Sequence, residues 1–383
     1  MADFSVIILG GRGLFGSRIA RRLARERGWR VVVAGRDGAA AARLCDELGK
    51  DPRTNAELVP LACDARAGTL HEHVLGAEAH LVINTSGPFQ GQDFSVARAA
   101  LTAGAHYIDL ADAREFVAAF ALLDAQARAC GRLAVSGAST VPGLSAAIVD
   151  RHCGEFARLD AIDIGISPGN RTPRGLATIA AILSYVGRPL PWRENGQRQE
   201  VAGWQKLHRR RYPAPAGPRW LAACDVPDLD LFPLRYPHLQ TLRFRAGLEL
   251  KRLHFGLWLL SWLVRARLLR GLERQAERLK AISELFLKAG SDVGAMHVEL
   301  RGIDAAGDAL RLVWQLVADR GDGPEIPATA AVLLARKLAN GDLTAIGAMP
   351  CLGLFTLEEF MAALDGYAIE TELQRFQSRK RPD

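Results

Sequence analysis

The sequence predicts an α/β protein: a Rossmann-type doubly wound parallel sheet, followed by a second, mixed α+β domain with antiparallel strands. Over the first 150 residues, short apolar runs alternate regularly with helical patterns, which is typical of a parallel sheet with helices on both faces. Further on, two alternating apolar runs, 293–303 and 309–317, are joined by a short turn that contains Gly307. This pattern indicates an antiparallel hairpin and therefore a different kind of sheet.

The elements of the first part follow from runs of apolar and β-branched residues for strands and from 3.6-residue periodicity for helices. Six strands are predicted, at residues 4–9, 30–34, 57–61, 81–84, 105–110 and 132–135. The main helices between them are predicted at residues 15–27, 39–48, 94–103 and 115–129. Near the C-terminus, Thr356 with Glu359 three residues later predicts a capping box at the start of a helix.

The composition is that of an ordinary globular protein, with 49% hydrophobic and 24% charged residues. The 383 residues are enough for two domains of roughly 100 to 200 residues. The six cysteines form no C-x-x-C pair, so we expect no disulfide framework and no metal site. The N-terminus has no basic segment and cleavage signal of an export peptide, which predicts a cytoplasmic protein.

The net charge of +7 is concentrated in one region. Residues 209–278 hold 14 Lys and Arg against 6 Asp and Glu. A nucleic-acid binder would be basic over a larger surface, so we expect no nucleic-acid partner.

A G-x-G-x-x-G motif, formed by Gly11, Gly13 and Gly16, lies between the first predicted strand and the first predicted helix. Glycines allow a tight turn and a close backbone approach, while a helix N-terminus offers free N–H groups and a positive dipole end to a pyrophosphate. We therefore predict that the three glycines, with Leu14 and Phe15, bind a dinucleotide cofactor.

The choice of cofactor depends on the end of the second strand, where an acidic residue would bind the ribose of NAD. Position 36 is an arginine, and its planar guanidinium suits the 2′-phosphate of NADP. Asp37 could bind a ribose instead, but we interpret it as the start of the next helix. Arg36 thus predicts NADP, with NAD as the less favoured alternative.

Two further strand ends complete the predicted nucleotide site, because ligands of an open parallel sheet lie beyond the carboxyl ends of its strands. Asp64 follows the third strand and could reach the adenine, or it could simply begin a turn. Thr85, Ser86, Gly87 and Pro88 follow the fourth strand. We predict that this small, hydroxyl-rich turn runs along the nicotinamide ribose; the alternative is a connecting loop.

Hydride chemistry also needs a proton donor or acceptor near the substrate. Asp112, just beyond the fifth strand, is the candidate catalytic residue; the alternative is that it caps the helix predicted at 115–129. None of the five tyrosines has a lysine four residues later, so the Tyr and Lys mechanism of short-chain dehydrogenases is excluded.

The glycine motif and four further segments resemble, in order and spacing, the saccharopine dehydrogenase-like oxidoreductases. These segments are Asn84–Phe89, Tyr107–Asp112, Gly137–Gly143 and Ile326–Ala331. The resemblance implies a Rossmann domain, a mixed second domain and a C-terminal stretch that packs back on the first. It also implies NAD(P) as the cofactor, which the family members acting on saccharopine or related amino-acid imines use; it implies the fold and the cofactor more directly than the reaction.

On this basis we predict a Rossmann domain at 1–150, a substrate and dimerisation domain at 151–320, and a C-terminal segment at 321–383 that returns to the Rossmann domain. The predicted function is an NADP-dependent oxidoreductase that transfers a hydride to or from an imine, amino-acid or carbonyl substrate. The alternative is a catalytically silent NADP-binding redox sensor or membrane-associated scaffold, because a fold does not determine a function.

Residues 253–274 form an apolar run followed by arginines. The apolar part is too short for the ~20 residues that span a bilayer. Trp258 and Trp262, one helical turn apart, would suit a helix lying on an anionic membrane surface, but a buried helix or a dimer contact explains them equally. We expect a homodimer with this segment at or near the interface, and take membrane-surface contact as the alternative.

Overall fold

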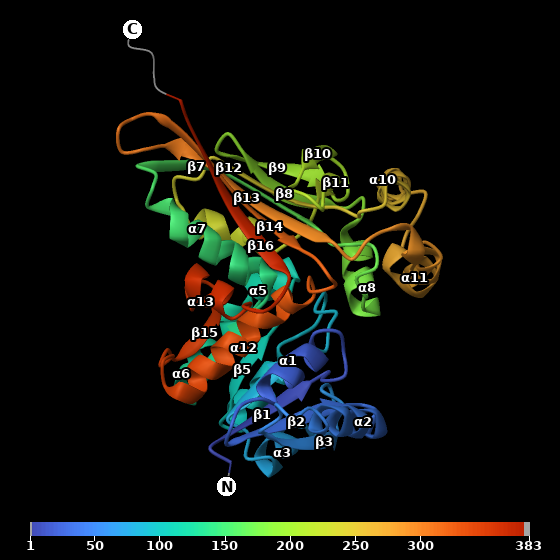
Figure 1. Ribbon diagram of the computed structural model, residues 1–383, viewed down its shortest axis with the longest axis vertical. Coiled ribbons are helices and arrows are strands. Elements are labelled where there is room, and N and C mark those ends of the chain that lie inside the picture. The colour runs from blue at the N-terminus through green and yellow to red at the C-terminus, as the bar shows by residue number, and fades with distance from the viewer. Residues whose placement is uncertain (1, 379–383) are drawn as a thin grey trace. The chain divides into compact units, whose positions relative to one another are not determined.

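A computed structural model of the protein describes residues 2–378. The chain forms two compact units, Met1–Leu144 with Pro324–Ala363, and Ser145–Gly323 with Leu364–Asp383. The C-terminal segment predicted as one piece is thus divided between the two units (Figure 1). Its last strand pairs antiparallel with a strand of the second unit, which draws that end of the chain away from the Rossmann sheet.

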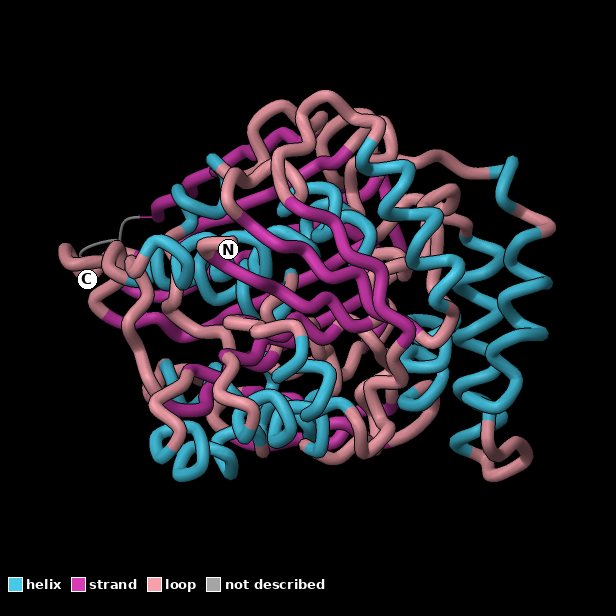
Figure 2. Tube along the Cα trace, turned by 90° about the horizontal axis from the view of Figure 1, so that it is seen from below, coloured by secondary structure: helices cyan, strands magenta, loops and turns pink. Residues whose placement is uncertain are grey.

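The first unit contains a seven-stranded sheet with the order β15-β6-β5-β4-β1-β2-β3, and all its strand pairs are parallel. This confirms the predicted Rossmann-type sheet, whose strands are visible in the end-on view of Figure 2. The strands are β1 (Phe4–Leu9), β2 (Trp29–Gly35), β3 (Glu57–Ala62), β4 (Leu81–Asn84), β5 (His106–Asp109), β6 (Leu133–Ser136) and β15 (Gly347–Pro350).

The helices of the first unit lie between these strands in the chain. They are α1 (Gly16–Leu23), α2 (Gly38–Gly49), α3 (Leu70–Gly76), α4 (Ser95–Thr102), α5 (Arg114–Ala118), η1 (Phe120–Leu123), α6 (Asp124–Ala129), η2 (Thr140–Leu144), α12 (Glu325–Asn340) and α13 (Leu357–Ala362). The predicted capping box is confirmed: Thr356 accepts from the backbone of Glu359, whose side chain accepts in turn from the backbone of Thr356.

Two predictions for this unit were wrong. The sheet has seven strands rather than six, because β15, with the sequence Gly-Ala-Met-Pro, has no β-branched residue and pairs with β6 from far along the chain. The single helix predicted at 115–129 is broken into α5, η1 and α6. The break brings Phe116 and Phe120 into one buried aromatic cluster with Phe94, at ring-centroid distances of 4.9 to 6.0 Å. Packing there overrides the helical periodicity.

The second unit contains a mixed sheet of nine strands, whose main path is β10-β11-β12-β7-β13-β14-β16, with β8 attached to β12 and β9 attached to β8. The predicted hairpin is confirmed, since β13 and β14 pair antiparallel along their full lengths. The strands are β7 (Arg158–Ser167), β8 (Pro189–Glu194), β9 (Gln197–Ala202), β10 (His208–Arg211), β11 (Pro218–Ala223), β12 (Thr241–Ala246), β13 (Gly294–Ile303), β14 (Ala309–Ala318) and β16 (Ile369–Ser378). The helices are α7 (Ser145–Cys153), α8 (Leu176–Tyr185), α9 (Asp228–Arg235), α10 (Lys251–Arg265), η3 (Leu272–Gln275), α11 (Ala276–Glu284) and η4 (Leu287–Ala289).

One face of this second sheet is apolar and the other is charged, because the pleat alternates side chains along each strand. Ile162, Ile164 and Val298 lie on the apolar face and are fully buried. On the opposite face the carboxylate of Glu299 accepts hydrogen bonds from Arg210, at 2.9 Å, and from Arg311, at 2.8 Å.

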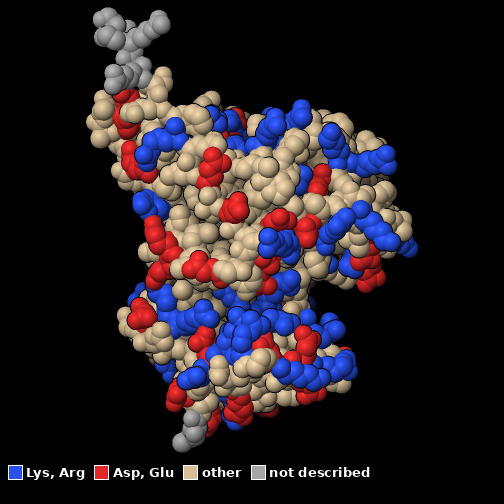
Figure 3. Space-filling view, viewed as in Figure 1, with Lys and Arg blue, Asp and Glu red and all other residues tan. Residues whose placement is uncertain are grey.

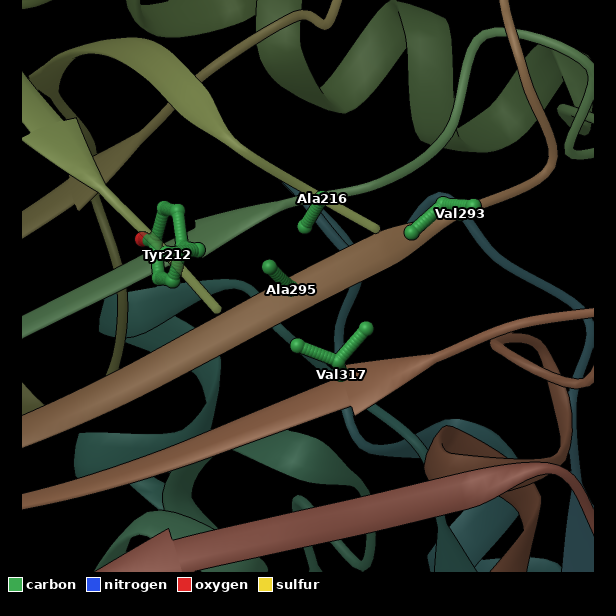
Figure 4. Packing of buried hydrophobic residues seen from close by; sticks show 5 residues of the cluster. All are labelled: Tyr212, Ala216, Val293, Ala295 and Val317. Carbon is green, nitrogen blue, oxygen red and sulfur yellow. The ribbon is translucent and has the colours of Figure 1, made fainter. Parts of the chain in front are cut away.

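A small apolar cluster covers part of the charged face (Figure 4). Tyr212 and Ala216, from the connection between β10 and β11, pack against Val293, Ala295 and Val317 at the β13 and β14 end of the sheet. This packing holds the β10 to β11 connection over the charged face.

Candidate functional site

The loop between β1 and α1 is a tight backbone turn. The N–H of Gly11 donates to the carbonyl of Ala34 in β2, at 3.0 Å, and the N–H of Gly13 donates to the carbonyl of Gly10, at 2.7 Å. α1 then begins at Gly16. The predicted glycine motif is therefore at the carboxyl end of β1 and directly before a helix, as dinucleotide binding requires.

The three glycines of the motif have different surroundings. A Cβ at Gly16 would touch the carbonyl of Gly10 and lie 2.8 Å from the Cα of Gly11. A Cβ at Gly11 would lie 2.8 Å from the side chain of Val33. At Gly13 it would meet only the Gly10 carbonyl, at 3.0 Å. Gly11 and Gly16 are thus needed for packing, whereas Gly13 is exposed and leaves the outer side of the loop open to a ligand.

The backbone at the start of α1 can bind an anion. Within residues 2–378, no backbone carbonyl accepts a hydrogen bond from the N–H groups of Leu14, Phe15 or Gly16. Free N–H groups at a helix N-terminus carry partial positive charge. The loop therefore fits the pyrophosphate of a dinucleotide in both shape and charge.

The end of β2 presents a guanidinium followed by a carboxylate that caps a helix. Arg36 is exposed. The neighbouring Asp37 is the N-cap of α2, and its side chain accepts a hydrogen bond from the N–H of Ala40 at 2.9 Å. This confirms our interpretation of Asp37 as the start of a helix.

The other predicted nucleotide-site residues lie at the same carboxyl edge of the sheet. Asp64 follows β3, is exposed, and accepts a hydrogen bond from the N–H of Arg66 at 3.0 Å, so it does begin a turn. Thr85 follows β4, and its hydroxyl donates to the carbonyl of Leu9 at 2.8 Å. The Thr85 side chain thereby ties the end of β4 to the glycine loop.

Ser86, Gly87 and Pro88 continue from Thr85 in a half-buried turn. The side-chain oxygen of Asn84, the last residue of β4, accepts a hydrogen bond from the N–H of Ser86 at 3.0 Å. The turn is thereby anchored to the strand that precedes it.

Residues 6–135 match the family model for the saccharopine dehydrogenase NADP-binding domain. This part of the chain is similar to that domain. The resemblance expected from the sequence is therefore confirmed over these residues. The match to the NADP-binding domain of a dehydrogenase supports the prediction of an NAD(P)-dependent oxidoreductase.

Solved structures extend the similarity in fold to both units. A saccharopine dehydrogenase (L-Glu forming) from Saccharomyces cerevisiae is 12% identical, with a TM-score of 0.67 over 97% of this chain and 100% of that one. An amine dehydrogenase from Mycobacterium smegmatis is 12% identical, with a TM-score of 0.47 over 91% and 95% of the two chains. No curated protein matches the sequence.

A buried polar network lies at the ends of β5 and β6. Asp109 is fully buried and accepts hydrogen bonds from Ser136, at 2.8 Å, and from the N–H groups of Gly137, at 2.9 Å, and Ala111, at 3.0 Å. Burial raises its pKa to about 6, against the opposing effect of these bonds. The carboxylate fixes the turns after both strands.

Asp112 is half-buried, three residues beyond the end of β5. Its carboxylate accepts a hydrogen bond from the Gln90 side chain at 3.3 Å, and burial raises its pKa. The alternative role as a helix cap was wrong, because Ala113 is the N-cap residue of α5 and no side chain caps that helix. Gln90 is a site residue that the sequence analysis missed, since no spacing rule links positions 90 and 112.

We predict that Gly13→Val abolishes dinucleotide binding with little loss of structure, because the added side chain occupies the open side of the loop. Gly49→Val is the matched control, since a Cβ at Gly49 meets no neighbour within 4 Å. Circular dichroism and NADPH titration by fluorescence measure the two effects. If the Gly13 variant binds NADPH like the control, the loop is only a turn.

Asp109→Asn should change stability in a pH-dependent way. The folded-state pKa of about 6 lies above the ordinary value of 3.8, so the unfolded chain loses this proton first. The stability contributed by the neutral acid is present below about pH 4, is lost as the pH rises to 6, and stays lost above it. Asparagine cannot ionise, so the variant should gain up to about 3 kcal/mol relative to the parent between pH 4 and pH 7.5. Urea unfolding at both pH values tests this; a difference that does not change with pH contradicts it.

Proposed function

We propose that the protein is an NADP-dependent oxidoreductase that acts on an imine, amino-acid or carbonyl substrate. The observation that carries the choice of NADP is the arrangement at the end of β2. Both side chains are exposed, but one oxygen of the Asp37 carboxylate accepts from the backbone of α2, whereas the Arg36 guanidinium is available to a ligand. A guanidinium pairs with a 2′-phosphate, and the carboxylate that would bind a ribose hydroxyl already has a partner.

The residues that would hold the cofactor lie on three neighbouring strand ends. The N–H groups of Leu14, Phe15 and Gly16 would bind the pyrophosphate. Arg36 would bind the 2′-phosphate, and the turn after Thr85 would support the nicotinamide ribose. When bound, the nicotinamide supplies or accepts the hydride.

Asp112 is the proposed proton donor or acceptor. Burial raises its pKa, so the carboxyl group retains a proton at a higher pH than an exposed aspartate does, which suits a general acid. The hydrogen bond from Gln90 orients the carboxyl group. Asp109 acts differently: all its described contacts are internal, so we assign it as a positioning residue for the adjacent turns.

The similarity in fold to a saccharopine dehydrogenase (L-Glu forming) supports the amino-acid or imine class of substrate. An assay of NADPH and NADP⁺ turnover on a panel of imines, amino acids and carbonyl compounds tests the enzymatic proposal. Stoichiometric NADPH binding with no turnover on any of them would favour the catalytically silent alternative.

We predict that Arg36→Ala weakens NADPH binding at least about tenfold, because a hydrogen bond to a charged group contributes about 1.5 to 3 kcal/mol. NADH binding should change little, since NADH has no 2′-phosphate. Arg30→Ala is the control, because Arg30 lies at the opposite end of β2 and pairs with Glu57. Equal losses for both nucleotides, or a parent protein that prefers NADH, would contradict the assignment of NADP.

Asp112→Asn should lower kcat at least about 100-fold, the lower end of the usual contribution of general acid and base catalysis. The measurement uses whichever substrate the panel identifies. The dissociation constant for NADPH should not change, because the nucleotide is held by other residues. A variant with unchanged kcat would exclude Asp112 as the proton donor or acceptor.

A further inference from the structure

α10 is a largely apolar helix whose two buried residues are polar, while the charged Lys251, Arg252 and Arg265 near its ends are exposed. Of its fifteen residues, all of them described, only His254 and Ser261 are buried. Large apolar side chains are exposed instead, with exposed fractions of 58% for Leu259 and 44% for Trp262. A surface helix normally buries its apolar stripe and exposes its polar side, so this orientation is the reverse of the usual one.

Polar contacts fix the helix in this orientation. The indole N–H of Trp204 donates to the carbonyl of His254 at 3.1 Å. The Gln205 side chain donates to the Ser261 hydroxyl at 3.4 Å and accepts from Arg265 at 3.0 Å. The helix is therefore attached along its polar side, and the opposite, apolar side is left outward.

Further exposed apolar side chains follow α10 in the chain, after its end, on α11 and just after α11. Together with those of α10 we call them the apolar edge, defined by Leu259, Trp262, Leu268, Ile282 and Leu285. Leu268 and Leu285 are 76% and 81% exposed. Both helices lie at the same edge of the second unit (Figure 1). Such a concentration of exposed apolar side chains marks an interaction surface.

Basic residues surround the apolar edge. Residues 251–288 contain nine Lys and Arg against three Asp and Glu, so they hold nearly all of the chain's net charge of +7. Figure 3 shows Lys and Arg side chains gathered over the region of α10 and α11. Arg252 precedes the exposed part of α10, and Arg267 and Arg270 follow it; all three are exposed.

A cavity of about 270 Å³ lies next to the apolar edge, within the second unit. Arg267 and Arg270 line it together with the apolar side chains of Leu183, Val264 and Leu269. Glu273 also lines it, and its carboxylate is paired with Arg188 at 3.1 Å. Guanidinium groups beside apolar walls suit the phosphate of a lipid headgroup whose acyl chains lie along the neighbouring apolar surface.

We propose that the apolar edge docks on the surface of an anionic lipid bilayer, with α10 lying along that surface. Aromatic and leucine side chains would enter the boundary between headgroups and acyl chains, and the surrounding arginines would pair with lipid phosphates. No helix within residues 2–378 is long and apolar enough to cross a membrane, so the contact is peripheral.

A second copy of the chain, the occupant expected from the sequence, is the competing possibility. A symmetric contact through this edge would bring the two basic segments together, and like charges at an interface are unfavourable. An anionic bilayer neutralises the same charges. The charge pattern therefore favours lipid over a second copy.

The test is co-sedimentation of the full chain with vesicles of phosphatidylcholine alone and of phosphatidylcholine with about 30% phosphatidylglycerol, an anionic lipid. We expect binding to the anionic vesicles only. Binding should be reversed as the Debye length falls from about 10 Å at 0.1 M salt to about 3 Å at 1 M. Absence of binding to anionic vesicles at 0.1 M salt would overturn the proposal.

Two variants separate the apolar and the basic contributions. Leu259→Ser with Trp262→Ser should lower vesicle binding at least about tenfold, because both side chains are already exposed and lose mainly their contact with lipid. Arg267→Gln with Arg270→Gln should lower it by about fivefold for each charge. The matched control is Leu122→Ser with Leu234→Ser, two exposed leucines outside the apolar edge, which should bind like the parent.

NADPH titration of every variant checks that it is folded and keeps this test separate from the proposed oxidoreductase function. Sedimentation equilibrium without vesicles measures the oligomeric state. A parent dimer that dissociates when Leu259 and Trp262 are replaced would show that a second copy covers the edge, and would overturn the proposal. Unchanged vesicle binding in that double variant would also overturn it.

Discussion

The nucleotide site depends on the close approach of α1 to the loop that precedes it. The backbone at Gly16 lies against that of Gly10 and Gly11, with no room for a Cβ. The Thr85 hydroxyl, which donates to the carbonyl of Leu9, joins the end of β4 to the same point. Two neighbouring strands and one helix therefore meet in a single backbone contact. This contact fixes the start of α1, where the N–H groups of Leu14, Phe15 and Gly16 have no backbone acceptor within residues 2–378 and can bind an anion.

Polar residues at the ends of three successive strands make the surrounding turns rigid. β4 ends in Asn84, β5 in Asp109 and β6 in Ser136, and all three side chains are buried. Asn84 accepts from the backbone of its own following turn, whereas Asp109 accepts from the turns after both β5 and β6 and also from Ser136. Burying polar groups is unfavourable unless they are hydrogen-bonded. Here the hydrogen bonds hold in place the loops from which a parallel sheet presents its ligand-binding groups.

Much of the first unit could be predicted from the sequence because its determinants are local. Each strand of a buried parallel sheet is a short apolar run, and the glycine motif lies directly between two such elements. The features that the sequence did not predict depend on contacts between residues that are far apart in the chain. β15 has no strand-like composition and forms only because β6 offers an open edge. The break after α5 follows from aromatic packing around Phe116, and the contact between Asp112 and Gln90 joins two loops that are separate in the chain. Arg36 could be identified because it directly follows a predicted strand, which is a local feature. A proton donor is harder to identify, because its surroundings depend on contacts between distant parts of the chain.

The orientation of α10 also could not be predicted from the sequence, and again the cause is a contact between distant parts of the chain. Its sequence is apolar on most sides, so periodicity alone does not indicate which side faces inward. That choice is made by Trp204 and Gln205, which lie about fifty residues earlier in the chain and hydrogen-bond to the helix at His254 and Ser261. These two helix positions are seven residues apart and therefore lie on one side of the helix. Once that side is inward, most of the leucines and tryptophans must lie along the flanks or outward. Leaving such a surface in water is unfavourable, and the arginines around it determine which kind of surface can cover it.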